Sequence, residues 1–191
     1  MATIEEIINY YRETGNFMKT AAIFNMNKRI LHLTLAKAGV LKINDKIDFG
    51  TTNLRNGGIA EKKFKEIFPE AISTNTCWQM NHPGYDFDLQ GLRIDVKYSS
   101  IRISKTGTMS WGTRGNDTEK KKKNPVDFFV LFLERGKNTG MEKAHILAVP
   151  GGMVKTGIAI FTSGDLFNEF RMEDEEELRE YLLSYAELIG G

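Results

Sequence analysis

The stretch that decides the fold is Tyr85-Asp86-Phe87-Asp88-Leu89-Gln90-Gly91-Leu92-Arg93-Ile94-Asp95-Val96-Lys97. Apolar and charged residues alternate on both sides of Gln90-Gly91, and successive side chains of a β-strand point to opposite faces of a sheet. The pattern predicts two strands, 85–89 and 92–98, each apolar on one face and charged on the other. Gln90-Gly91 is a two-residue connection of the kind that closes a tight hairpin.

Further strands and helices surround this hairpin. Apolar runs predict more strands at 72–80, 126–134, 144–149 and 158–161. Apolar residues at helical spacing predict a helix over 59–68, which Pro69 ends, and a C-terminal helix over 173–187. The order helix, hairpin, further strands, helix indicates an α/β (α+β) fold.

The charged face of the hairpin brings Asp86, Asp95 and Lys97 together. Asp95 and Lys97 lie two positions apart and point to the same side of their strand, and hairpin pairing places Asp86 beside them. Two converging carboxylates repel each other, and a hard divalent cation such as Mg²⁺ relieves the repulsion. A lysine beside the metal can orient the attacking water or stabilise a developing oxyanion. The set fits a metal-dependent phosphodiester hydrolase; the plainer alternative is a strand face that carries charges only for solubility.

These residues resemble the PD-(D/E)xK nuclease superfamily, which has the restriction-endonuclease-like fold. The resemblance is carried by Pro83-Gly84-Tyr85-Asp86, Asp95-Val96-Lys97 and Glu61 on the preceding helix, and it covers residues 57–165. It implies that Asp86, Asp95 and Glu61 hold Mg²⁺, for which Mn²⁺ can substitute. It also implies that Lys97 assists hydrolysis, and that a central mixed sheet is flanked by helices.

The match departs from the family's pattern in two ways. The proline precedes the first aspartate by three positions instead of one, and the second acid is Asp where Glu is commoner. Neither change removes a ligand. Asp88 could take the place of Asp86, and Glu66 or Glu70 could take the place of Glu61.

The N-terminal residues 18–40 resemble a helix-turn-helix of the kind found in site-specific recombinases and many regulators. Lys19–Phe24 would be the first helix, 25–27 the turn and Lys28–Ala38 the recognition helix, with Gly39 at its end. Before them, Thr3 and Glu6 fit a capping box for a first helix that stops near Gly15. Recognition helices present their first residues to base edges. The expected DNA contacts are therefore Asn27, Lys28, Arg29 and His32.

Three parts follow from these patterns. Residues 1–45 form a helix-turn-helix domain, the polar and turn-rich segment 46–57 a linker, and residues 58–191 the nuclease domain. The alternative for the first part is a three-helix module that serves dimerisation or packing.

Charge is segregated along the chain although the net charge is only +1. Residues 97–123 hold eight Lys or Arg and two acids, whereas 165–191 hold nine acids and two arginines. A basic middle with an acidic far side suits a polyanion partner. We expect the segment 101–123 to be a flexible basic loop in which Lys105 and Arg114 contact DNA. Trp111 in this loop would either stack on bases or anchor the core.

Composition excludes several classes of protein. With 41% hydrophobic residues the chain can bury a core, and its apolar runs are far shorter than the roughly 20 residues that span a bilayer. A single cysteine excludes a disulfide scaffold and a cysteine-based zinc cluster. The N-terminus lacks the pattern of a signal peptide, so a cytoplasmic location is expected.

The expected function is a Mg²⁺-dependent DNA endonuclease, restriction-like or homing-type, targeted to duplex DNA by the N-terminal helices. Because one active site cuts one strand, a double-strand break calls for a homodimer. The alternative is a non-catalytic helix-turn-helix regulator with an inactive α/β domain.

Overall fold

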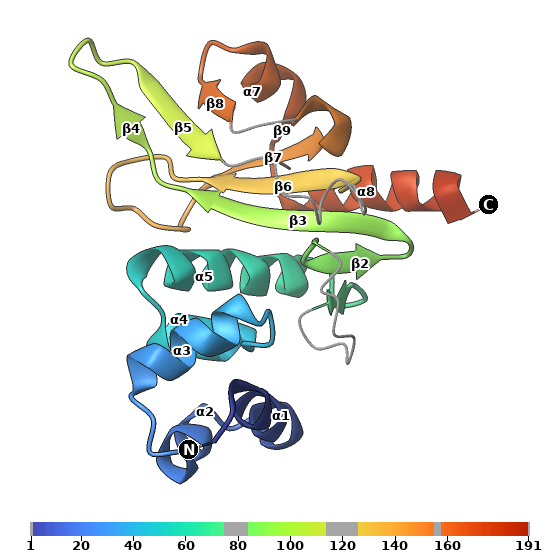
Figure 1. The fold of residues 1–191 in the computed structure, drawn as a ribbon. Coiled ribbons are helices and arrows are strands. Elements are labelled where there is room, and N and C mark those ends of the chain that lie inside the picture. The colour runs from blue at the N-terminus through green and yellow to red at the C-terminus, as the bar shows by residue number, and fades with distance from the viewer. Residues whose placement is uncertain (1, 75–83, 114–125, 155–157, 191) are drawn as a thin grey trace.

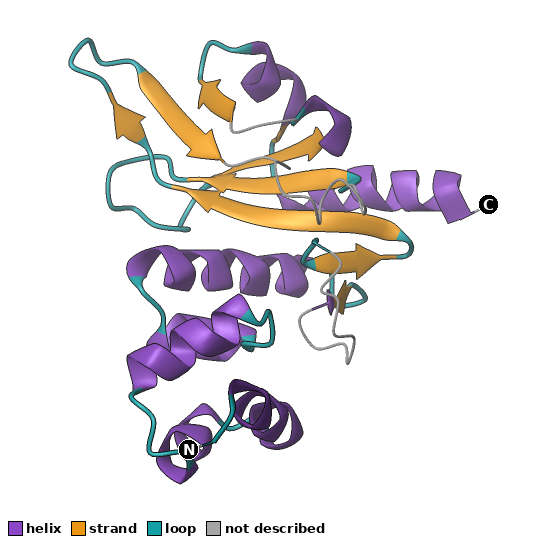
Figure 2. Ribbon diagram, viewed as in Figure 1, coloured by secondary structure: helices purple, strands orange, loops and turns teal. Residues whose placement is uncertain are grey.

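A computed structural model describes residues 2–74, 84–113, 126–154 and 158–190. Within these ranges the chain is a mixed α/β fold of seven α-helices and nine strands (Figures 1 and 2). No helix in the described ranges is long and apolar enough to cross a membrane.

Four helices open the chain: α1 (Ile4–Thr14), α2 (Phe17–Ile23), α3 (Lys28–Lys37) and α4 (Ile43–Phe49). The predicted capping box of α1 is confirmed, because the Thr3 hydroxyl accepts from the Glu6 amide and the Glu6 carboxylate accepts from the Thr3 amide. Gly15 ends α1 with a φ of 56°, in the left-handed region that glycine adopts without strain. The two predicted helices on either side of residues 25–27 are present as α2 and α3.

These helices share a small apolar core. Its most buried members are Tyr11, Phe17, Leu31, Leu35 and Leu41. The Tyr11 hydroxyl adds a polar tie, because it donates to the Asp45 carboxylate and accepts from the Lys42 amide at 3.1 Å. α1 is therefore held to the start of α4.

The segment 46–57, expected to be a turn-rich linker, is helical instead. Residues 46–57 lie in α4 and in the first part of α5 (Thr52–Ile67), separated by a break at Gly50 and Thr51. The polar, glycine-containing sequence still forms helix because α4 packs closely on α5 at Gly58. Tertiary packing here overrides low helix propensity.

The central sheet has six strands in the order β1-β2-β3-β6-β7-β9. Their bounds are β1 (Ile72–Ser73), β2 (Phe87–Leu89), β3 (Leu92–Ser99), β6 (Phe128–Leu133), β7 (His145–Pro150) and β9 (Arg171–Met172). β3 and β6 are parallel and the other neighbours are antiparallel, so the sheet is mixed. The hairpin turn is confirmed, with positive φ at Gln90 and Gly91. Of the predicted strand 72–80, β1 occupies the first two residues, and 75–80 lie outside the described ranges.

A second, three-stranded sheet replaces much of the expected loop. β4 (Arg102–Ile103), β5 (Met109–Thr113) and β8 (Ile158–Phe161) pair in the order β4-β5-β8. The prediction of a loop is therefore wrong for 102–103 and 109–113, which form β4 and β5, whereas 104–108 are the exposed turn between them. Residues 114–125 lie outside the part that the structure describes. The sequence also gave no signal for the short 3₁₀ helix Gly151–Met153 or for α7 (Asp165–Phe170).

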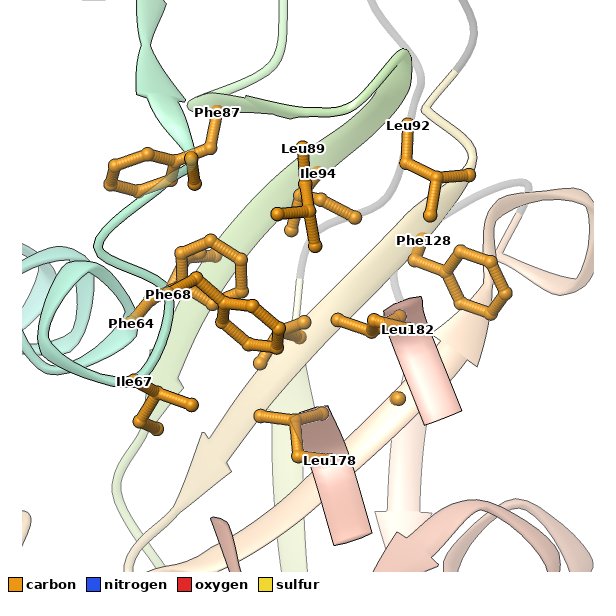
Figure 3. Packing of buried hydrophobic residues seen from close by; sticks show 14 of the residues in the cluster. Phe64, Ile67, Phe68, Phe87, Leu89, Leu92, Ile94, Phe128, Leu178 and Leu182 are labelled. Atoms are coloured by element: carbon orange, nitrogen blue, oxygen red, sulfur yellow. The ribbon is translucent and has the colours of Figure 1, made fainter. Parts of the chain in front are cut away.

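Both faces of the central sheet are covered. α5 and the C-terminal α8 (Glu175–Gly190) pack on one face, where Phe64, Phe87, Ile94 and Leu182 belong to the same cluster (Figure 3). The second sheet and α7 cover the other face. All six residues of β6 are buried for this reason.

Trp111 belongs to that second core and is not available for DNA bases. Its ring is buried and stacks on Phe167 with centroids 5.5 Å apart, and its indole N–H donates to the Glu134 carbonyl at 2.8 Å. The core alternative for this tryptophan is therefore confirmed.

Candidate active site

Asp86 lies where β2 and β3 separate. Its backbone amide donates to the Ile94 carbonyl at 2.9 Å, and the regular β2–β3 pairing ends next to it. The next inward amide of β3, that of Val96, donates to the Asp86 carboxylate at 2.8 Å. The Asp86 carboxylate thus accepts the hydrogen bond that a backbone carbonyl of a neighbouring strand would otherwise accept. This contact holds the carboxylate against the middle of β3.

Asp95 and Lys97 lie on the opposite side of β3 from the residues that pack under α5. The Lys97 amine and the Asp95 carboxylate are 2.5 Å apart. The Asp95 side chain is only 3% exposed whereas that of Lys97 is 32% exposed. The acid is therefore enclosed at the centre of the sheet and the amine covers it from the solvent side.

The pKa of Lys97 depends on its burial and on the carboxylates near its amine. Burial alone would lower the pKa of this ammonium. The negative charges of Asp95, Asp86 and Glu61 outweigh burial, so the pKa of the amine lies above its usual value. Three carboxylates from α5, the start of β2 and β3 thus act on one lysine, which is a cation at neutral pH in this arrangement.

Glu61 is on the buried side of α5 and pairs with a residue that sequence reasoning missed. Both of its carboxylate oxygens lie 2.7 Å from the Lys46 amine of α4. Their side chains are only 9% and 16% exposed. No pattern could have found Lys46, because it lies in the segment predicted to be a linker and reaches Glu61 only through helix packing.

Two of the three alternative acids have other contacts, and the third is exposed. The Asp88 carboxylate accepts from the Gly91 amide at 2.9 Å and so supports the hairpin turn. Glu70 forms an ion pair with Arg179 of α8 at 2.9 Å. Glu66 is exposed on α5. The structure therefore brings Asp95 and Lys97 into contact, with Asp86 held on the Val96 amide between them and Glu61 near enough for its charge to act on Lys97. Asp88 and Glu70 have roles elsewhere.

The donor set fits a hard divalent cation in its chemistry. Mg²⁺ and Mn²⁺ bind carboxylate oxygens, and Asp86, Asp95 and Glu61 are the acids that could provide them. Across the described ranges, no three His, Cys, Asp or Glu side chains form a group arranged to hold a metal. In this arrangement the lysines neutralise two of the three acids, as Lys97 pairs with Asp95 and Lys46 with Glu61.

The predicted DNA contacts on α3 divide into exposed and buried residues. Lys28 and Arg29 are exposed, and Asn27 caps the helix by accepting from the Arg29 amide at 2.9 Å. The placement of His32 toward DNA is wrong, because its side chain is 3% exposed and packs edge-on against Phe17. His32 lies beside the stripe that faces the core and is covered with it.

Of the two DNA contacts predicted in the segment 101–123, the structure describes one. Lys105 is exposed in the turn of the β4–β5 hairpin. Arg114 lies outside the described residues.

No family model, curated protein or solved structure matches the chain.

Proposed function

We propose that the chain is a metal-dependent DNA endonuclease, restriction-like or homing-type, with a restriction-endonuclease-like nuclease domain. The observation that carries the proposal is that the Lys97 amine lies 2.5 Å from the buried Asp95 carboxylate, while the Asp86 carboxylate accepts from the Val96 amide between them at 2.8 Å. The negative charge of Glu61 on α5 also acts on Lys97. A strand face that is charged only for solubility has no reason to enclose its acid, yet Asp95 of β3 is buried. Glu61 of the neighbouring helix α5 is buried as well.

Each residue has a role that follows from its place. Asp86, Asp95 and Glu61 would hold Mg²⁺, which supplies Lewis-acid activation of the scissile phosphate when bound. Lys97 is a partly exposed cation beside these acids, where it positions the attacking water and stabilises negative charge that develops on the phosphate. Lys28, Arg29 and Lys105 are exposed cations suited to contact DNA phosphates. Cutting both strands would call for a homodimer, because one such site would cut one strand.

A second candidate function is supported by the ion pairs. Asp95 and Glu61 each contact a lysine, as in a structural charge cluster. In that case the chain would be a DNA-binding regulator whose α/β part has no catalytic activity.

A plasmid assay separates the two functions. Supercoiled plasmid is incubated with Mg²⁺ or Mn²⁺ and with the wild type, Lys97→Ala or Asp95→Asn. The wild type should nick or linearise the plasmid, and each variant should lose about 100-fold or more of the rate, as when one electrostatic stabiliser is removed. Lys63→Ala is the matched control, because Lys63 forms a surface ion pair with Glu175 away from these acids.

The outcome that contradicts the proposal is equally direct. If the wild type leaves the plasmid supercoiled with both metals and still retards it on a gel, the chain is a regulator. Circular dichroism of each variant confirms that lost cleavage is not lost folding.

A further inference from the structure

Lys46 forms an ion pair with Glu61, the residue of α5 that is proposed to bind the metal. Its amine is 2.7 Å from both oxygens of Glu61, so one ammonium faces both oxygens of that carboxylate. The side chains are only 16% and 9% exposed, so solvent screens this pair poorly. A divalent cation that uses Glu61 must therefore displace this ammonium or share the carboxylate with it.

The fold, and not a flexible surface arm, puts Lys46 in this position. α4 approaches α5 so closely that a Cβ placed on Gly58 would lie 3.1 Å from the Lys46 Cβ. The residue before Lys46 is Asp45, whose carboxylate accepts from the Tyr11 hydroxyl. The N-terminal helices thus fix the start of the lysine side chain, and its amine ends at Glu61.

We infer that Lys46 is a positioning residue that competes with the divalent metal for Glu61 and sets the metal affinity of the site. This inference rests on the proposed function. The physical reason is that metal binding at Glu61 requires loss of a short, poorly screened ion pair, which opposes it. Coupling between two binding events is reciprocal, so metal binding also weakens the contact between α4 and α5. The N-terminal helices are in this way linked to the chemistry of the sheet.

The test measures metal binding without any turnover. Mn²⁺ is titrated calorimetrically into the metal-free full-length chain in the absence of DNA, for the wild type, Lys46→Met and Lys46→Arg. Lys46→Met should bind Mn²⁺ at least about tenfold more tightly than the wild type, because the competing charge is gone. Lys46→Arg should bind like the wild type, since a guanidinium keeps the charge and can face both carboxylate oxygens.

Two controls make the result specific. Lys63→Met removes a lysine of α5 that pairs with Glu175, and its Mn²⁺ affinity should stay within about twofold of the wild type because exposed pairs are well screened. Asp95→Asn should abolish the binding, which shows that the titrated site is the proposed one. If Lys46→Met does not fold, Lys46→Gln provides the same neutralisation with a side chain that can still donate to Glu61.

The outcomes distinguish this inference from the function on which it rests. If the wild type binds Mn²⁺ in a way that Asp95→Asn abolishes, but neither neutral variant binds more tightly, Lys46 is only a structural tie. If the wild type shows no binding that depends on Asp95, both the metal site and the competition at Glu61 are overturned.

Discussion

His32 shows what a single buried polar side chain does to the pH dependence of stability. Burial lowers the pKa of this imidazole, and the nearby charge of Asp45 only partly offsets the effect. Its Nε2 atom has no hydrogen-bond partner among the described residues. Because the pKa is lower in the folded than in the unfolded state, the unfolded chain binds the proton more readily. The contribution of His32 is complete above its unfolded pKa of about 6.5 and is lost as the pH falls through the folded value.

Replacing His32 by Leu should therefore flatten the acid side of the stability profile. We expect the melting temperature of His32→Leu to fall less between pH 7.5 and 5.0 than that of the wild type, because no proton can bind at this position in the unfolded state. Differential scanning calorimetry at several pH values measures the effect. Lys28→Leu, at an exposed position of the same helix, is the control and should keep the wild-type slope. A wild-type slope in His32→Leu would contradict the argument.

The error about His32 has a simple geometric origin. Leu31 and Leu35 define the buried side of α3, and both are fully buried. His32 lies about 100° around the helix from Leu31, a direction that either the core or solvent can occupy. What decides is the neighbouring helix, because Phe17 of α2 covers the ring. That contact is tertiary and no periodicity within α3 contains it.

At the scale of elements, the two adjacent glycines of α5 make opposite demands. A Cβ on Gly57 would meet nothing within 4 Å, whereas one on Gly58 would lie 3.0 Å from Ile47 and 3.1 Å from Lys46. Alanine is favoured over glycine inside a helix by about 0.5–1 kcal/mol. Only Gly57 can take that gain without displacing α4.

We expect Gly57→Ala to raise the free energy of unfolding by about 0.5–1 kcal/mol. Gly58→Ala should be less stable than Gly57→Ala by about 1–2 kcal/mol, because the added methyl overpacks the contact between α4 and α5. Urea denaturation of the two variants and the wild type gives both values. Equal stabilities would mean that α4 does not pack against α5 as the structure shows.

The same helix pair explains which elements the sequence could predict. The hairpin of β2 and β3 follows a strict alternation over a short stretch, so its turn and its charged face were readable. α4 and the start of α5 have polar sequences with glycines, and they are helical because each packs on the other. Three of the gathered charges, those of Asp86, Asp95 and Lys97, belong to the readable hairpin. Lys46 could not be read, because it joins them only through that packing.

At the scale of the whole molecule, the cations proposed to contact DNA and the acids proposed to hold the metal belong to different parts of the chain. Lys28 and Arg29 are exposed at the start of α3, and Lys105 is exposed in the β4–β5 turn. Asp86, Asp95 and Glu61 belong to the segment before β2, to β3 and to α5, and Asp95 and Glu61 are buried. The proposed function therefore predicts that DNA affinity and cleavage depend on different residues.

The double variant Lys28→Ala/Arg29→Ala should weaken DNA binding and change its salt dependence. If both side chains contact phosphates, the slope of log affinity against log salt concentration should become shallower by up to about 2, because fewer counterions are released. Fluorescence anisotropy with a labelled duplex between 50 and 200 mM salt, in the absence of divalent metal, measures the slope.

A second double variant that loses the same charge at another surface tests whether DNA binds at α3. Lys137→Ala/Lys143→Ala removes two exposed lysines between β6 and β7, which the proposed function gives no DNA contact. This control should keep the wild-type slope. If both double variants lose the same slope, binding follows the overall charge of the molecule, and α3 is a packing helix instead of a recognition helix. If only the α3 variant has a shallower slope, the N-terminal helices bind the duplex. Lys46 of α4 would then link this DNA-binding part to Glu61 and so to the proposed metal site.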